Sequence, residues 1–152
     1  MNRRLVTPQP TMENTMLAQT LIVAGALMLG LLGTLHLAYT FFSNKFDPRD
    51  AATMPAMKAT SMVLTSRTSL WNAWVGFNAS HSLGVMLFAG VYLLLALGHM
   101  ALLRESPALL WLAPLGALAY LALARRYWFR TPLLGIAFSS ACFVGAALSL
   151  TI

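Results

Sequence analysis

The chain has 152 residues, of which 59% are apolar and only 9% are charged, and its formal net charge is +6. Soluble domains carry about 25% charged residues, so this chain lacks the polar side chains that would cover a water-facing globule. Its apolar content also excludes an intrinsically disordered protein, and the single cysteine, Cys142, excludes an intramolecular disulfide framework. The composition therefore predicts a small integral membrane protein.

Four long stretches without charged residues follow one another along the chain. A helix needs about 20 mostly apolar residues to cross a hydrocarbon core roughly 30 Å thick, and each stretch is long enough. Backbone groups in lipid must pair within their own segment, and period-two alternation is absent, so the stretches are predicted to be helices. Ser106-Pro107 and Thr131-Pro132 give the last two helices an N-cap followed by proline. The predicted helices cover about 14–42, 70–103, 107–125 and 132–151.

The segment 43–69 is the one long connection between these helices, and Pro48 and Pro55 interrupt it. A short amphipathic helix from about Met54 to Leu64 is expected there, lying on the membrane surface. The sequence shows no internal repeat and no second domain. The predicted fold class is therefore all-α: one integral membrane domain over 1–152, built as a four-helix transmembrane bundle with one long interfacial loop.

The distribution of lysine and arginine predicts how the chain is oriented. The side that holds the amino terminus carries three of these residues and the opposite side carries seven, which places both termini outside the cytoplasm. The positive charge lies in small clusters at helix ends, where it favours contact with anionic lipid and not nucleic-acid binding. The smaller group consists of Arg3, Arg4 and Arg104.

Polar residues gather at one end of the first two predicted helices. His36 lies six residues before the end of the first helix, and His81 lies near the start of the second, so an antiparallel pair brings both to a similar depth. Polar side chains in membrane helices usually turn toward partners or a cavity, and they serve either as interhelical hydrogen-bond donors and acceptors or as a ligand site. The candidate ligand-binding residues are His36, Trp71, Trp74, Asn78 and His81.

Two kinds of function fit this cluster. The leading hypothesis is a non-enzymatic protein that binds a partner or a small apolar ligand, with the imidazoles fixing a polar head group such as a quinone oxygen. The alternative is a redox protein or enzyme in which His36 and His81 hold a metal or a single haem b. Copper bound by His36, Met54 and Met57 is a weaker form of that alternative. The spans contain no charged residue, which opposes a proton-coupled transporter.

The last predicted helix carries small residues at spacings of four, three and four. Such a stripe lets another backbone approach closely. It serves either packing inside the bundle or docking of a partner subunit or a second copy, which would make the chain an accessory subunit of a larger complex. The stripe consists of Gly135, Ser139, Cys142 and Ala146.

Two runs in the first half of the chain, HLAYTFFSNKFDPRD and LTSRTSLWNAWVGFNASHSLG, carry a family resemblance. With the pattern W-x-x-x-x-G-F-N-x-S-H-S, they resemble a family of small four-pass bacterial integral membrane proteins of uncharacterised activity. The resemblance covers about residues 34–90 and implies a location in a bacterial inner membrane but no activity. It implies that one group of residues acts together: His36, Asp50, Trp71, Asn78 and His81.

Overall fold

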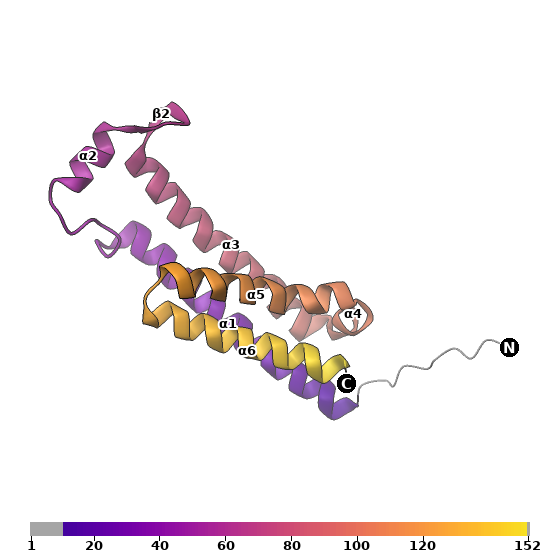
Figure 1. Cartoon of the computed structure of the whole chain (residues 1–152). Helices are drawn as coiled ribbons and strands as arrows, with labels where there is room; N and C mark the ends of the chain where they lie inside the picture. Colours follow the sequence, from indigo (N-terminus) through magenta and orange to yellow (C-terminus); the bar gives the residue numbers. More distant parts are fainter. Residues whose placement is uncertain (1–10, 152) are drawn as a thin grey trace. The chain divides into compact units, whose positions relative to one another are not determined.

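The computed structural model describes residues 11–151, and these form a helical protein (Figure 1). Four of its helices are long and apolar enough to cross a membrane, which confirms the predicted four-pass, all-α fold class. Their lengths are 31, 29, 21 and 22 residues. These helices are α1 (Met12–Phe42), α3 (Leu70–Gly98), α5 (Pro107–Tyr127) and α6 (Arg130–Thr151).

The second membrane helix ends earlier than the sequence predicted. α3 stops at Gly98, and His99 leaves the helical conformation at φ −141° and ψ 38°. The short helix α4 (Met100–Glu105) then follows. Glycine has a low helix propensity because its backbone is the least restricted in the unfolded chain, so a break after Gly98 costs little. Ser106 caps α5 as predicted, because its hydroxyl oxygen accepts a hydrogen bond from the backbone N–H of Leu109 at 3.3 Å.

The loop between α1 and α3 differs from the prediction. The helix expected from Met54 to Leu64 is shorter, because α2 covers only Thr53–Ala59. The residues after it form a small antiparallel hairpin of β1 (Ser61–Met62) and β2 (Thr65–Ser69). Thr60 precedes β1 and Thr65 begins β2, and their β-branched side chains favour extended backbone over helix. Pattern reasoning missed these strands because they are too short to show alternation.

The chain divides into two compact units. Among the described residues, unit 1 comprises 11–29 and 88–151, and unit 2 comprises 30–87. Unit 1 therefore contains all of α5 and α6 and part of α1 and of α3. Unit 2 contains the last turns of α1, the loop with α2 and the hairpin, and the first turns of α3. That the whole chain acts as a single domain stays a prediction.

Unit 1 has a core of aromatic rings and small residues. The ring centroids of Phe88, Tyr92 and Phe143 lie 4.9–5.9 Å from one another, and the Tyr92 hydroxyl donates a hydrogen bond to the carbonyl of Leu109 at 2.8 Å. α5 and α6 run side by side as an antiparallel pair (Figure 1). α1 approaches α6 closely, since a Cβ built on Gly25 would lie 3.1 Å from that of Cys142. Small side chains thus hold this unit together, as is usual between membrane helices.

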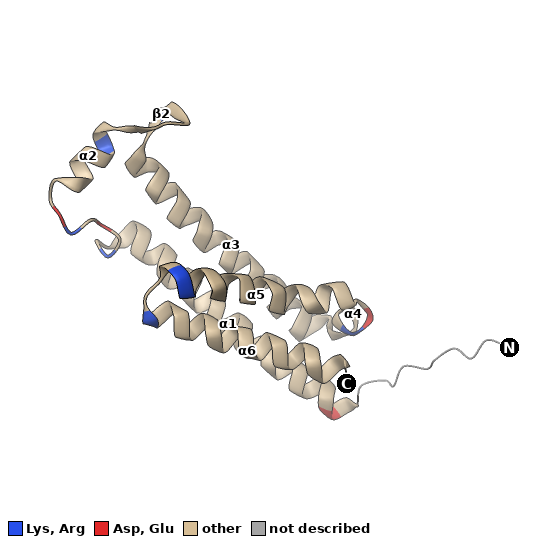
Figure 2. Ribbon diagram, in the orientation of Figure 1, with Lys and Arg blue, Asp and Glu red and all other residues tan. Residues whose placement is uncertain are grey.

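Charged residues of the described chain lie at helix ends and in the loop, and the interiors of the four long helices carry none (Figure 2). Glu13 lies in the first turn of α1, and Arg125 and Arg126 lie in the last turn of α5. This placement is what a bilayer requires, because an unpaired charge in hydrocarbon is costly. Arg3 and Arg4, which enter the orientation count, lie outside the described residues, and the orientation stays a prediction.

Candidate functional site

The candidate site lies within unit 2, where the last turns of α1 meet the first turns of α3. Gly33 makes this meeting close, since a Cβ built on it would lie 2.9 Å from Cγ of Met86 and 3.2 Å from the carbonyl oxygen of Ser82. His36 follows Gly33 by three residues on α1 and therefore lies on nearly the same face of that helix. The absence of a side chain at Gly33 thus lets His36 reach α3.

A hydrogen bond joins His36 to Asn78 across the two helices. The Asn78 amide nitrogen donates to the carbonyl oxygen of Trp74 at 2.8 Å. This bond fixes the orientation of the amide, so that its oxygen faces α1. Asn78 Oδ1 then lies 2.9 Å from His36 Nε2. Because this oxygen only accepts, Nε2–H of His36 is the donor. Asn78 is buried, with 5% of its surface exposed, and this pairing satisfies its polar atoms.

Four rings stand in a row beside this bond. The centroid of His36 lies 4.4 Å from that of Phe46 and 5.5 Å from that of His81. The His81 ring in turn stacks on Phe77 at 6.1 Å with an interplanar angle of 14°. We call Phe46, His36, His81 and Phe77 the ring row. Its two inner rings are imidazoles, and its outer ring Phe77 is 64% exposed on the helix surface.

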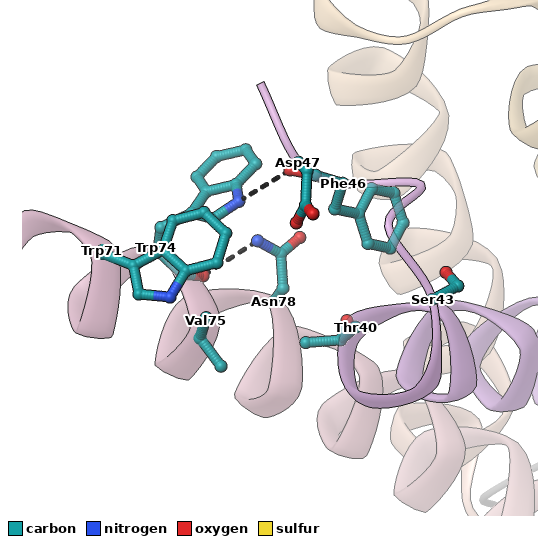
Figure 3. A pocket seen from close by; sticks show the side chains of 8 residues that line it. All are labelled: Thr40, Ser43, Phe46, Asp47, Trp71, Trp74, Val75 and Asn78. Carbon is teal, nitrogen blue, oxygen red and sulfur yellow. Dashed lines mark hydrogen bonds between the residues drawn. The ribbon is translucent and has the colours of Figure 1, made fainter. Parts of the chain in front are cut away.

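A small cavity lies between α3 and the segment after α1, with Phe46 of the ring row and Asn78 in its wall (Figure 3). Its volume of about 20 Å³ is enough for one water molecule and far below the roughly 300–1,000 Å³ of a drug-sized ligand site. In Figure 3 the carboxylate of Asp47 and the amide of Asn78 point toward each other across it. The lining residues are Thr40, Ser43, Phe46, Asp47, Trp71, Trp74, Val75 and Asn78.

The segment after α1 covers this cavity and is tied to α3. The indole N–H of Trp74 donates to the carbonyl oxygen of Phe46 at 3.3 Å, drawn as a dashed line in Figure 3. Asp47, next in the chain, is half-buried and reaches the cavity. The sequence did not single out Phe46 as a site residue, because loop residues follow no periodicity that would place them over a helix. The tryptophans were the available signal, since an indole N–H needs an acceptor nearby.

The structure brings His36, Asn78, His81 and Trp74 together and extends the group to Trp71 through the cavity. Asp50, which the resemblance grouped with them, has a different place. Its carboxylate accepts hydrogen bonds from the backbone N–H of Ala52 at 3.2 Å and from the hydroxyl of Thr53 at 2.9 Å. Asp50 therefore shapes the turn before α2. It also borders a separate groove of about 420 Å³ beside α2, whose wall is mostly apolar.

The small-residue stripe of α6 packs against the chain itself. The Ser139 hydroxyl donates to the carbonyl oxygen of Gly25 at 2.8 Å, and Ser139, Cys142 and Ala146 are all at most 6% exposed. Gly135, at the end of the stripe, is half-buried. α1 thus covers the face of α6 that was a candidate for docking a partner or a second copy. This contact favours the other alternative, in which the stripe packs inside the bundle.

The described residues offer no ready site for a metal ion or a haem. Among residues 11–151, no group of three or more histidine, cysteine, aspartate or glutamate side chains is arranged to hold a metal ion. His36 and His81 are near neighbours, but His36 already donates to Asn78 and its other face packs on Phe46. The adjoining cavity of about 20 Å³ has no room for a porphyrin. Haem or metal binding would therefore require these rings to rearrange.

No protein-family model, curated protein or solved structure matches this chain. The chain is a small multi-pass membrane protein, and the resemblance of residues 34–90 to a bacterial family stays a prediction.

Proposed function

We propose that this membrane protein binds a small amphiphile dissolved in the bilayer, and that the ring row holds its polar head group. The observation that supports this most directly is the order of the rings, in which two imidazoles lie between Phe46 and the exposed Phe77. Imidazoles both donate and accept hydrogen bonds, whereas the outer rings offer only apolar contact. A head group with a carbonyl or hydroxyl oxygen matches this order.

The size of the cavity limits what is enclosed. A space of about 20 Å³ accepts one water molecule, and neither imidazole lines it, so a ligand held by the ring row must lie outside this cavity. Phe77 and Trp74 are 64% and 41% exposed, and they give a ring or an alkyl tail a surface on the lipid side. The ligand class is therefore a quinone-like or other lipid-soluble molecule with a compact head.

A thermal-shift measurement on the chain in lipid nanodiscs tests this proposal. Ubiquinone with a decyl tail is the probe, and decane is the matched control that lacks the head group. The unfolding midpoint of the wild type should rise with the probe and not with decane, because a ligand that binds only the folded state stabilises it.

Variants of the three histidines show where the probe binds. His36→Ala and His81→Ala should abolish the probe-induced shift, whereas His99→Ala should keep it, because His99 is exposed beyond the end of α3. If the probe leaves the wild-type midpoint unchanged while both variants simply unfold at lower temperature, the cluster is structural and the proposal fails. Equal shifts in all variants would place the ligand elsewhere and would also overturn it.

A further inference from the structure

The β-hairpin of unit 2 ends in two aliphatic residues. Val63 and Leu64 join β1 to β2, and their surfaces are 109% and 89% exposed. Two-residue turns usually carry glycine, asparagine or aspartate, which adopt the backbone dihedral angles of tight turns and expose no apolar side chain to water. Two bulky apolar side chains at such a tip instead form a surface that would be more stable out of water.

The base of the hairpin is fixed at the start of α3. The backbone N–H of Leu70 donates to the carbonyl oxygen of Thr60 at 2.9 Å, and this bond closes the hairpin where the helix begins. The next residue is Trp71, with the Lys58 ammonium 5.7 Å from the centre of its ring. Tryptophan is typical of the boundary between hydrocarbon and water, so the hairpin starts at that boundary.

The direction of the hairpin keeps it near the membrane. In Figure 1 the hairpin does not continue the line of α3 but turns sideways where the helix starts. A membrane-spanning helix stands on average about 20° from the bilayer normal. An element that turns sideways from its end therefore runs along the membrane surface and does not project away into water.

The charge around the tip is positive. Between residues 51 and 103 the chain has two basic residues and no acidic residue, and the basic ones are Lys58 and Arg67. Both side chains are exposed, and they lie on either side of Val63 and Leu64 in the sequence. Apolar tip residues flanked by basic ones match a surface of anionic lipid, whose acyl chains lie beneath phosphate groups.

We propose that the hairpin tip inserts into the lipid leaflet beside it. Val63 and Leu64 enter the acyl region, and Lys58 and Arg67 bind the phosphate groups of anionic lipids. This contact is independent of the ligand proposed for the ring row, since the tip contributes no residue to that cluster.

Fluorescent labelling of the full chain in nanodiscs tests this insertion. Cys142→Ala removes the native thiol, and Leu64→Cys then carries an environment-sensitive nitrobenzoxadiazole label. The label should emit at shorter wavelength than in water and should be quenched by lipids that carry a doxyl group. Both effects should be larger in nanodiscs that contain phosphatidylglycerol than in phosphatidylcholine alone. The matched control is a label at Ala51→Cys, an exposed position before α2, which should show water-like emission.

Three results would overturn the proposal. Water-like emission from position 64 in both membranes would mean that the tip stays in solution. Short-wavelength emission without quenching by doxyl lipids would mean that protein covers the tip, either a second copy or another partner. A response to phosphatidylglycerol that survives Lys58→Gln with Arg67→Gln would mean that these two residues do not bind the lipid phosphates.

Discussion

Nε2 of His36 lies 2.9 Å from Oδ1 of Asn78, and this bond connects the end of α1 to the beginning of α3. The same asparagine donates to the carbonyl oxygen of Trp74 on its own helix, so one buried amide orients the histidine and supports the backbone of α3. Polar groups of this kind in a membrane protein give both stability and a defined geometry.

The His36–Asn78 pair should show measurable coupling. A double-mutant cycle with His36→Leu and Asn78→Leu in bicelles should give a coupling free energy of about 0.6 kcal/mol, the average for interhelical hydrogen bonds in membranes, and at most about 1.7 kcal/mol. The measurement is the free energy of unfolding of the wild type, the two single variants and the double variant. Effects of the two single changes that simply add would show that the two side chains act independently.

The close approach at Gly33 should tolerate no larger side chain. Gly33→Val places methyl groups where Met86 and the carbonyl of Ser82 already lie, and should destabilise the protein by about 1–3 kcal/mol, as overpacking does. Gly84→Ala on α3 is the control, since nothing lies within 4 Å of its added Cβ. Unfolding in the same bicelles compares the two. Equal effects of the two changes would mean that the helices do not meet closely at Gly33.

Ser139 and Ser140 of α6 should contribute unequally to the free energy of unfolding. The Ser139 hydroxyl bonds to Gly25 on another helix, whereas the equally buried Ser140 hydroxyl bonds to Ile136 of its own helix. Ser139→Ala should therefore lower the free energy of unfolding by about 1 kcal/mol more than Ser140→Ala does. If instead Ser139→Ala leaves stability intact and changes the oligomeric state, the stripe serves a partner.

The segment that covers the cavity should loosen when the Trp74 indole loses its N–H. Trp74→Phe keeps an aromatic ring but removes the hydrogen bond to the carbonyl of Phe46. Hydrogen exchange in residues 43–50, followed by mass spectrometry, should become faster. Trp111→Phe in α5 is the control and should leave that segment unchanged. Unaltered exchange in both variants would show that other contacts hold the segment.

The membrane helices were predictable because each depends on one local property. An apolar stretch of about 20 residues must form a helix in lipid whatever surrounds it, so α1, α3, α5 and α6 follow from composition and length. The proximity of His36 and His81 followed as well, because an antiparallel pair of helices brings their positions to one level. Helix periodicity and antiparallel pairing were enough to predict this part of the site.

The remaining features depend on contacts that a linear pattern does not contain. Phe46 packs on His36 because the chain turns back after α1, and no periodicity marks that turn. The strands β1 and β2 have two and five residues, too few to show alternation. The role of Asp50 in the turn before α2 was hidden because an aspartate in a loop fits a cap and a binding site equally well.

The four membrane helices form a longer pair, α1 and α3, and a shorter pair, α5 and α6. At 1.5 Å per residue, α1 and α3 extend about 46 and 43 Å, whereas α5 and α6 extend about 31 and 33 Å. Only the shorter pair matches a hydrocarbon core of roughly 30 Å. Within unit 2, the last turns of α1 and the first turns of α3 carry three members of the ring row, His36, His81 and Phe77. We expect a thinner bilayer to leave the imidazoles at the end of α1 and the start of α3 among hydrated head groups, and a thicker one to surround them with hydrocarbon.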